Sequence, residues 1–210
     1  MNSNDALNTL NEIKDIMSRS KRFQTISGGS IIIIGIYASI VALGAWIILG
    51  DHAPYGWLPK YWQDFAINTP RHTIVAAAIA AGLVAVSFGT VSILSYLKTK
   101  RLNHHFAFDA TVRRALANFM VPAVSGALFC VAMLVQQHYG LTSSIMLIFY
   151  GLSLINCSHY ATSSIAALGY GELILGLVDC FVIDHALLFW FLGFGLLHVV
   201  YGIYYLIKEK

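Results

Sequence analysis

Six apolar stretches, each about as long as a bilayer is thick, constrain this 210-residue chain more than any other feature. A helix rises ~1.5 Å per residue, so about 20 apolar residues cross a hydrocarbon core of ~30 Å. The chain is 58% hydrophobic and only 11% charged, and most of its charges lie between the stretches. We therefore expect an all-α, polytopic bundle of six transmembrane helices. The predicted spans are 30–50, 73–97, 115–136, 141–158, 162–183 and 186–207.

The lysines and arginines are distributed unequally between the two sides of this predicted bundle. With six spans, the bases before the first span, between the second and third, and after the last all face one side. Only Lys60 and Arg71 fall on the other side. Basic loops stay in the cytoplasm, so both termini are predicted to be cytoplasmic. A five-span alternative, which fuses the fourth and fifth stretches, would place the C-terminus outside.

The segment before the first span is predicted to form a short amphipathic helix. Its apolar residues recur at steps of three and four, as on one helix face: Leu7, Leu10, Ile13 and Met17. Such a helix can lie in the inner headgroup region or present its apolar stripe to a cytoplasmic protein. Both alternatives stay open. The predicted domains are 1–29 with a Gly/Ser joint, 30–207 as the transmembrane bundle, and 208–210 as a cytoplasmic end.

Three ionisable residues fall inside predicted spans, where a charge costs at least ~2.5 kcal/mol and marks a functional candidate. Glu172 lies about 15 Å into the fifth span, and His198 lies about 18 Å into the sixth, which runs the opposite way. Both residues share a helix face with glycines, which let helices approach closely. The sequence therefore predicts a contact between Glu172 and His198. Asp179, nearer the outer end, is expected to connect this pair to outside water.

A buried carboxylate and imidazole can serve two purposes. They can bind helices together, or they can form a proton or cation site, because such coupled groups can exchange a proton near neutral pH. The residues do not decide between these hypotheses. His159 and Asn156, near an interface, are accessory candidates for the site.

Other chemistries receive little support. There is no HExxH, GxSxG or phosphate-binding glycine motif, so we expect no enzyme, and no cofactor is indicated. A metal site made by His159, Glu172 and His198 is a minor alternative. The bases do not gather on one face with aromatic residues, so no nucleic-acid binding is expected.

Several short segments resemble a group of small bacterial inner-membrane proteins to which no activity is assigned. They are Arg22-Phe23 with Ser27-Gly28, Gly171-Glu172 with Leu175-Gly176-Leu177, Leu188-Phe189-Trp190 with Gly193-Phe194-Gly195, His198, and Tyr201-Gly202. The likeness is most specific over the last forty residues or so. It implies a multi-pass protein of a bacterial inner membrane and carries over no catalytic residue.

Two classes of function follow from these features. The first is movement of a proton, ion or small solute through a site at Glu172 and His198, with Asp179 as an access residue. The second is a non-catalytic sensor or scaffold that binds a cytoplasmic partner through the N-terminal helix. The lipid bilayer is the expected surrounding in both, and a homo-oligomer is compatible with either.

Overall fold

The structure is a computed structural model of the whole chain. It describes residues 28–49, 82, 85–87, 89–94, 96–97, 100, 110–136, 141–161, 164–182 and 185–209. These residues form helices and the turns between them, without a β-strand, which confirms the predicted all-α class for this part of the chain. The main helices are α2 (Gly28–Leu49), α5 (Ala110–Val135), α6 (Thr142–Ser158), α7 (Ile165–Asp179), α8 (Ala186–Trp190), the π-helical segment η3 (Phe191–Leu197) and α9 (His198–Glu209).

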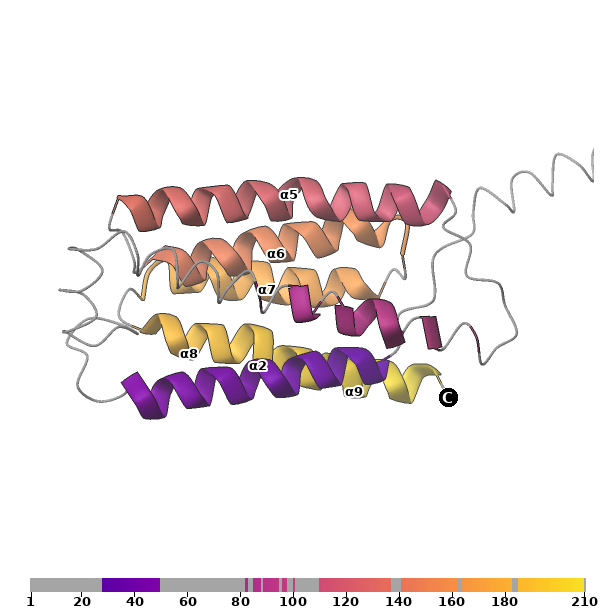
Figure 1. Cartoon of the computed structure of the whole chain (residues 1–210), viewed down its shortest axis with the longest axis horizontal. Helices are drawn as coiled ribbons and strands as arrows, with labels where there is room; N and C mark the ends of the chain where they lie inside the picture. Colours follow the sequence, from indigo (N-terminus) through magenta and orange to yellow (C-terminus); the bar gives the residue numbers. More distant parts are fainter. Residues whose placement is uncertain are drawn as a thin grey trace, which may run out of the picture.

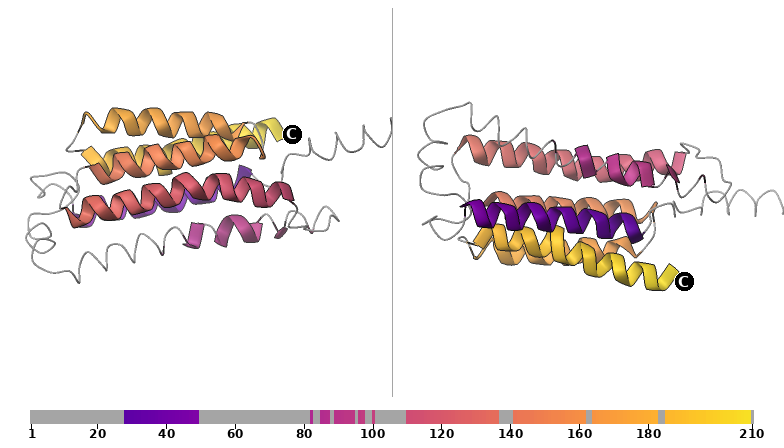
Figure 2. Two further views of the ribbon diagram at one scale, coloured as in Figure 1. Left: turned by 90° about the horizontal axis from the view of Figure 1, so that it is seen from above. Right: turned by 60° about the horizontal axis from the view of Figure 1, so that its bottom comes forward.

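These helices lie side by side along one axis (Figure 1). α5 packs on α6, α6 packs on α7, and α2 packs on η3 and α9. Figure 2 shows α2, in indigo, alongside the yellow C-terminal helices. α8, η3 and α9 follow one another without a break and form one long rod. Because α6 and α7 are separate antiparallel helices, they do not form the single fused span of the five-span alternative.

Glycines set the closest approaches between helices. A Cβ atom added to Gly151 of α6 would lie 2.6 Å from the carbonyl oxygen of Gly169 in α7, and the reverse distance is 2.8 Å. A Cβ atom on Gly35 of α2 would lie 2.8 Å from the carbonyl oxygen of Gly195 in η3. Backbone therefore rests on backbone at both interfaces, as small residues allow in membrane bundles. The α6 and α7 contact brings polar side chains of both helices within reach of one another.

Two described helices, Ala110–Val135 and Leu187–Lys208, are long and apolar enough to cross a membrane. The outward face of α5 carries large exposed apolar side chains, among them Val121 (69% exposed) and Val135 (70% exposed). An apolar face of this size is unfavourable in water and compatible with lipid. The buried core lies toward one end of the bundle and consists of Ile31, Leu154, Cys157, Ile165, Leu168, Tyr201 and Tyr205.

The helix ends differ from the predicted spans where a charge or a turn intervenes. α5 begins at Ala110 rather than 115, because its backbone hydrogen bonding continues through Arg113 and Arg114, where hydropathy drops. α7 ends at Asp179 rather than 183, because the chain turns there: the amide of Val182 donates to the carbonyl of Asp179. α9 continues to Glu209, so residues 208 and 209 extend the last helix.

Some predictions lie outside the described residues. These include the amphipathic stripe Leu7, Leu10, Ile13 and Met17 and most of the predicted span 73–97. The number of membrane crossings and the side on which each terminus lies therefore stay predictions.

Candidate functional site

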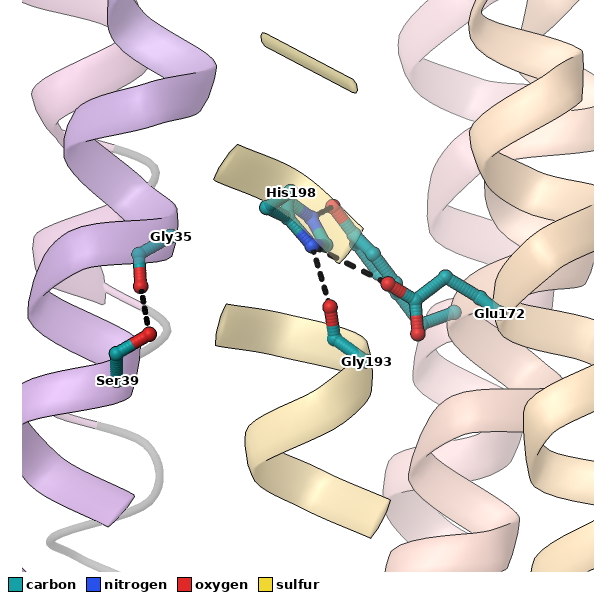
Figure 3. Close-up of polar contacts among 6 residues, drawn as sticks. Gly35, Ser39, Glu172, Gly193 and His198 are labelled. Carbon is teal, nitrogen blue, oxygen red and sulfur yellow. Dashed lines mark hydrogen bonds and ion pairs between the residues drawn. The ribbon is translucent and has the colours of Figure 1, made fainter. Parts of the chain in front are cut away.

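Glu172 and His198 lie against each other in the interior of the bundle (Figure 3). Glu172 comes from the middle of α7, and His198 is the first residue of α9, directly after the π-helical segment. The Nδ1 atom of His198 is 3.2 Å from the Oε1 atom of Glu172. Their side chains are 2% and 0% exposed. The contact predicted from matched depth is confirmed. The glycines that share the faces of Glu172 and His198 meet other helices, because Gly169 and Gly176 approach α6 whereas Gly195 and Gly202 approach α2.

Both ring nitrogens of His198 have further partners. Nδ1 is 3.0 Å from the carbonyl oxygen of Gly193, and Nε2 is 2.9 Å from the hydroxyl oxygen of Tyr150 in α6. A carbonyl oxygen only accepts, so Nδ1 carries a hydrogen. Nε2 then accepts the Tyr150 hydroxyl when the ring is neutral, and donates to it when the ring is cationic. In neither state does the imidazole keep a free lone pair for a metal ion.

The carboxyl group of Glu172 is short of partners. Neither of its oxygens has a hydrogen-bond partner among the described residues, since the Nδ1 hydrogen of His198 is directed at Gly193. A buried ionised carboxylate without a counter-charge is very costly, so the charge of Glu172 depends on His198. The neutral combinations are a carboxylate with an imidazolium and a carboxylic acid with an imidazole. They differ by the position of one proton.

The π-helical segment shapes the space in which this pair lies. A Cβ atom on Gly193 would lie 2.6 Å from the Oε2 atom of Glu172 and would collide with the side chain of Leu147. A larger residue at this position would therefore displace the ends of the Leu147 and Glu172 side chains. The segment also brings the Gly193 carbonyl to the side chain of His198, five residues later. Such π-helical turns are frequent at functional sites.

Aromatic rings cover the other side of the histidine. The ring of Tyr150 stacks on that of His198, with centroids 5.5 Å apart and planes 24° apart. Phe194 contacts both rings, and Phe119 and Trp190 extend the cluster. These rings keep water from the imidazole, so electrostatic interactions inside the cluster are stronger than at a surface.

Asp179 forms a separate polar contact near the end of α7. Its Oδ2 atom accepts hydrogen bonds from the hydroxyls of Ser143 (2.5 Å) and Ser144 (2.9 Å) in the first turn of α6. The side chain is only 1% exposed. Asp179 is therefore buried in this structure, and its expected role as an access residue open to outside water stays a prediction.

The accessory candidates do not join the central pair. Asn156 and His159 are exposed at the C-terminal end of α6, and neither takes part in the contacts of Glu172 or His198 described above. Within the part of the chain that the structure describes, no three His, Cys, Asp or Glu side chains are grouped closely enough to hold a metal ion. The minor alternative of a metal site with His159, Glu172 and His198 is thus wrong in this structure.

The sequence reasoning missed the residues that α6 contributes. Ser143, Leu147, Tyr150 and Gly151 recur at helical spacing and share the face that meets α7. This pattern was a usable signal, because Gly151 marks the face of closest approach. By contrast, the sequence shows no pattern specific to the π-helical segment.

The arrangement can hold and transfer a proton between two neighbouring side chains, and a third side chain, Tyr150, extends the hydrogen-bonded chain to another helix. Comparisons with protein-family models, with curated proteins and with solved structures found no match for this chain. A function for this chain is therefore inferred from the chemistry of the described residues.

Proposed function

We propose that this chain is a six-span protein of a bacterial inner membrane with both termini in the cytoplasm. The uneven distribution of bases, the exposed apolar face of α5 and the two long apolar helices support this topology. Reporter fusions after Lys210 and within loop 51–72 test it. We expect a cytoplasmic signal at the C-terminus and a periplasmic signal in the loop. A periplasmic signal at the C-terminus would contradict six spans.

Within this topology, we propose that the bundle binds and moves a proton at Glu172 and His198. The observation that carries the proposal is the 3.2 Å approach of Nδ1 to Oε1, in a fully buried site where the carboxylate has no hydrogen-bond partner among the described residues. A purely structural pair gains most from a direct hydrogen bond. Here the imidazole hydrogen is directed at a backbone carbonyl, so both oxygens of Glu172 are free to accept a proton.

Proton transfer in the pair conserves charge. The hydrogen on Nδ1 of the imidazolium passes to Oε1 of Glu172, which leaves a carboxylic acid and a neutral imidazole that keeps its hydrogen on Nε2. Nδ1 then gives up its hydrogen bond to the Gly193 carbonyl and accepts from the new carboxylic hydroxyl, while Nε2 donates to Tyr150. Transport then requires that the pair takes up a proton from one side of the membrane and releases it to the other. Tyr150 is in place to pass a proton to or from Nε2, because its hydroxyl is already hydrogen-bonded there.

The structure favours a proton over a metal ion or an organic solute at this position. Both nitrogens of His198 are engaged, so the ring has no lone pair to offer to a metal ion. A single Cβ atom added at Gly193 would already collide with Leu147 and with the carboxyl group, so this position has no room for a solute without rearrangement.

A proteoliposome assay with an internal pH-sensitive dye tests the proposal. Glu172→Gln keeps the size of the side chain and removes its ability to carry a proton. We expect this variant to fold and to lose proton flux, whereas the matched control His159→Gln, at an exposed histidine, should keep it. A folded Glu172→Gln protein that moves protons at the wild-type rate would leave the pair with a structural role only.

A further inference from the structure

Asp179 is a second buried carboxylate, and only one of its two oxygens is hydrogen-bonded within the described residues. Its Oδ2 atom accepts two serine hydroxyls, but its Oδ1 atom has no hydrogen-bond partner among the described residues. The side chain is 1% exposed, so bulk water does not serve Oδ1 either. A buried polar atom without a partner is uncommon, and a bound ion is one explanation for it.

Burial disfavours an uncompensated charge on Asp179, and two serine hydrogen bonds offset only part of this cost. Ser143 and Ser144 both donate to Oδ2, and both lie in the first turn of α6, at the positive end of that helix. A proton on Oδ1 would create a hydroxyl that also lacks an acceptor among the described residues. A cation at Oδ1 instead neutralises the charge and gives the oxygen a partner.

We propose that Asp179, Ser143 and Ser144 bind a monovalent cation, with Na⁺ as the ion that fits best. The donor atoms are all oxygens, which suits hard cations and excludes soft metals. They supply a single negative charge, whereas Ca²⁺ sites use more oxygen ligands and usually several carboxylates. The two hydroxyl oxygens keep lone pairs while they donate to Oδ2.

The end of α7 adds to this preference. Asp179 is the last residue of α7, and a helix C-terminus carries partial negative charge that attracts cations. In secondary transporters, the C-terminal ends of broken helices coordinate Na⁺ or H⁺.

The Asp179 site is distinct from the pair at Glu172. The two carboxylates are about two turns, ~10 Å, apart along α7. Leu147, which is fully buried, contacts α7 at Gly176, between them. Neither serine takes part in the described contacts of His198. The cation site therefore does not depend on the proposed proton pathway, and an experiment can refute one of the two proposals without refuting the other.

Thermal unfolding of the purified full chain in detergent tests the site. NaCl is titrated against choline chloride at constant total chloride, with LiCl and KCl in parallel. We expect Na⁺ to raise Tm by ~3–6 °C at ten times its Kd. Binding of radioactive ²²Na⁺ should saturate at one ion per chain.

Variants in α6 and α7 test whether Na⁺ binds at Asp179, Ser143 and Ser144. Asp179→Asn should abolish both the Tm rise and ²²Na⁺ binding. The double variant Ser143→Ala with Ser144→Ala, which keeps the carboxylate, should weaken binding at least tenfold and serves if Asp179→Asn does not fold. Glu172→Gln should keep the full Na⁺ response. Equal effects of Na⁺, K⁺ and choline on the wild type, or an unchanged Na⁺ response in the serine variant, would overturn the proposal.

Discussion

Adding one methyl group at Gly193 should disconnect the proposed proton pair without changing either ionisable residue. In Gly193→Ala, the new Cβ atom would start 2.6 Å from Oε2 of Glu172, whereas ordinary contact begins at 3.4 Å. The two atoms must therefore separate by about 0.8 Å (3.4 − 2.6). If the carboxyl group takes up this movement, the distance from Nδ1 to Oε1 grows from 3.2 Å toward about 4.0 Å.

The stability cost of this substitution can be bounded. The methyl group also collides with Leu147, and overpacking of a filled core costs about 1–3 kcal/mol. For a chain of this size, each kcal/mol lowers Tm by about 2–4 °C. We therefore expect Gly193→Ala to unfold roughly 2–12 °C below the wild type. We also expect it to lose most of its proton flux in the proteoliposome assay.

Gly195→Ala is the matched control for this experiment. It adds the same methyl group to the same π-helical segment, but the new Cβ atom meets the side chain of Ser39 in α2 and no ionisable group. A similar fall in Tm with flux retained is expected for Gly195→Ala. Equal loss of flux in both variants would refute the reasoning, because it would trace the loss to the segment rather than to the displaced Glu172.

Three further predictions address other parts of the molecule. Tyr150→Phe keeps the ring stacked on His198 but leaves Nε2 without a partner, so we expect a loss of about 1–3 kcal/mol in unfolding free energy and slower proton flux in the dye assay. Gly151→Ala should lower Tm because its Cβ atom meets rigid backbone of α7. Gly89→Ala, where no described atom lies within 4 Å, should leave Tm unchanged or raise it slightly. If the N-terminal stripe binds a cytoplasmic protein, Leu10→Asp with Met17→Asp should abolish co-purification of that partner while membrane insertion persists. Recovery of the same partners from the variant would count against the sensor or scaffold alternative.

The sequence was sufficient to predict the contact between Glu172 and His198, because helix geometry converts residue number into depth and face. The matched depth of the two residues carried this prediction, whereas Gly169 and Gly176, on the face of Glu172, mark the approach of α6 rather than of the helix with His198. Burial in an apolar bundle then requires each ionisable group to find a partner.

The remaining features of the site depend on interactions that hydropathy and spacing do not encode. The identity of the hydrogen-bearing nitrogen in His198 follows from the Gly193 carbonyl, which reaches the ring through a π-helical turn. The burial of Asp179 follows from the early end of α7, where the chain turns and the first turn of α6 supplies two hydroxyls. The apolar run in the sequence continues to residue 183, so hydropathy does not indicate that α7 ends at Asp179.

The burial of the two carboxylates of α7 depends on a glycine of the same helix. Glu172, Gly176 and Asp179 lie on one face of the helix, and a Cβ atom on Gly176 would lie 2.9 Å from both the Cβ atom of Leu147 and the backbone nitrogen of Ile148. Because α6 approaches α7 closely at Gly176, residues of α6 contact polar groups on either side of that glycine. Ser143 and Ser144 bond to Asp179, and Tyr150 bonds to His198, the partner of Glu172. A wider separation would admit water or leave both carboxylates without neighbours, and either outcome weakens the electrostatic coupling of buried groups. The small residue between the two sites is therefore what allows one helix to carry two buried acids.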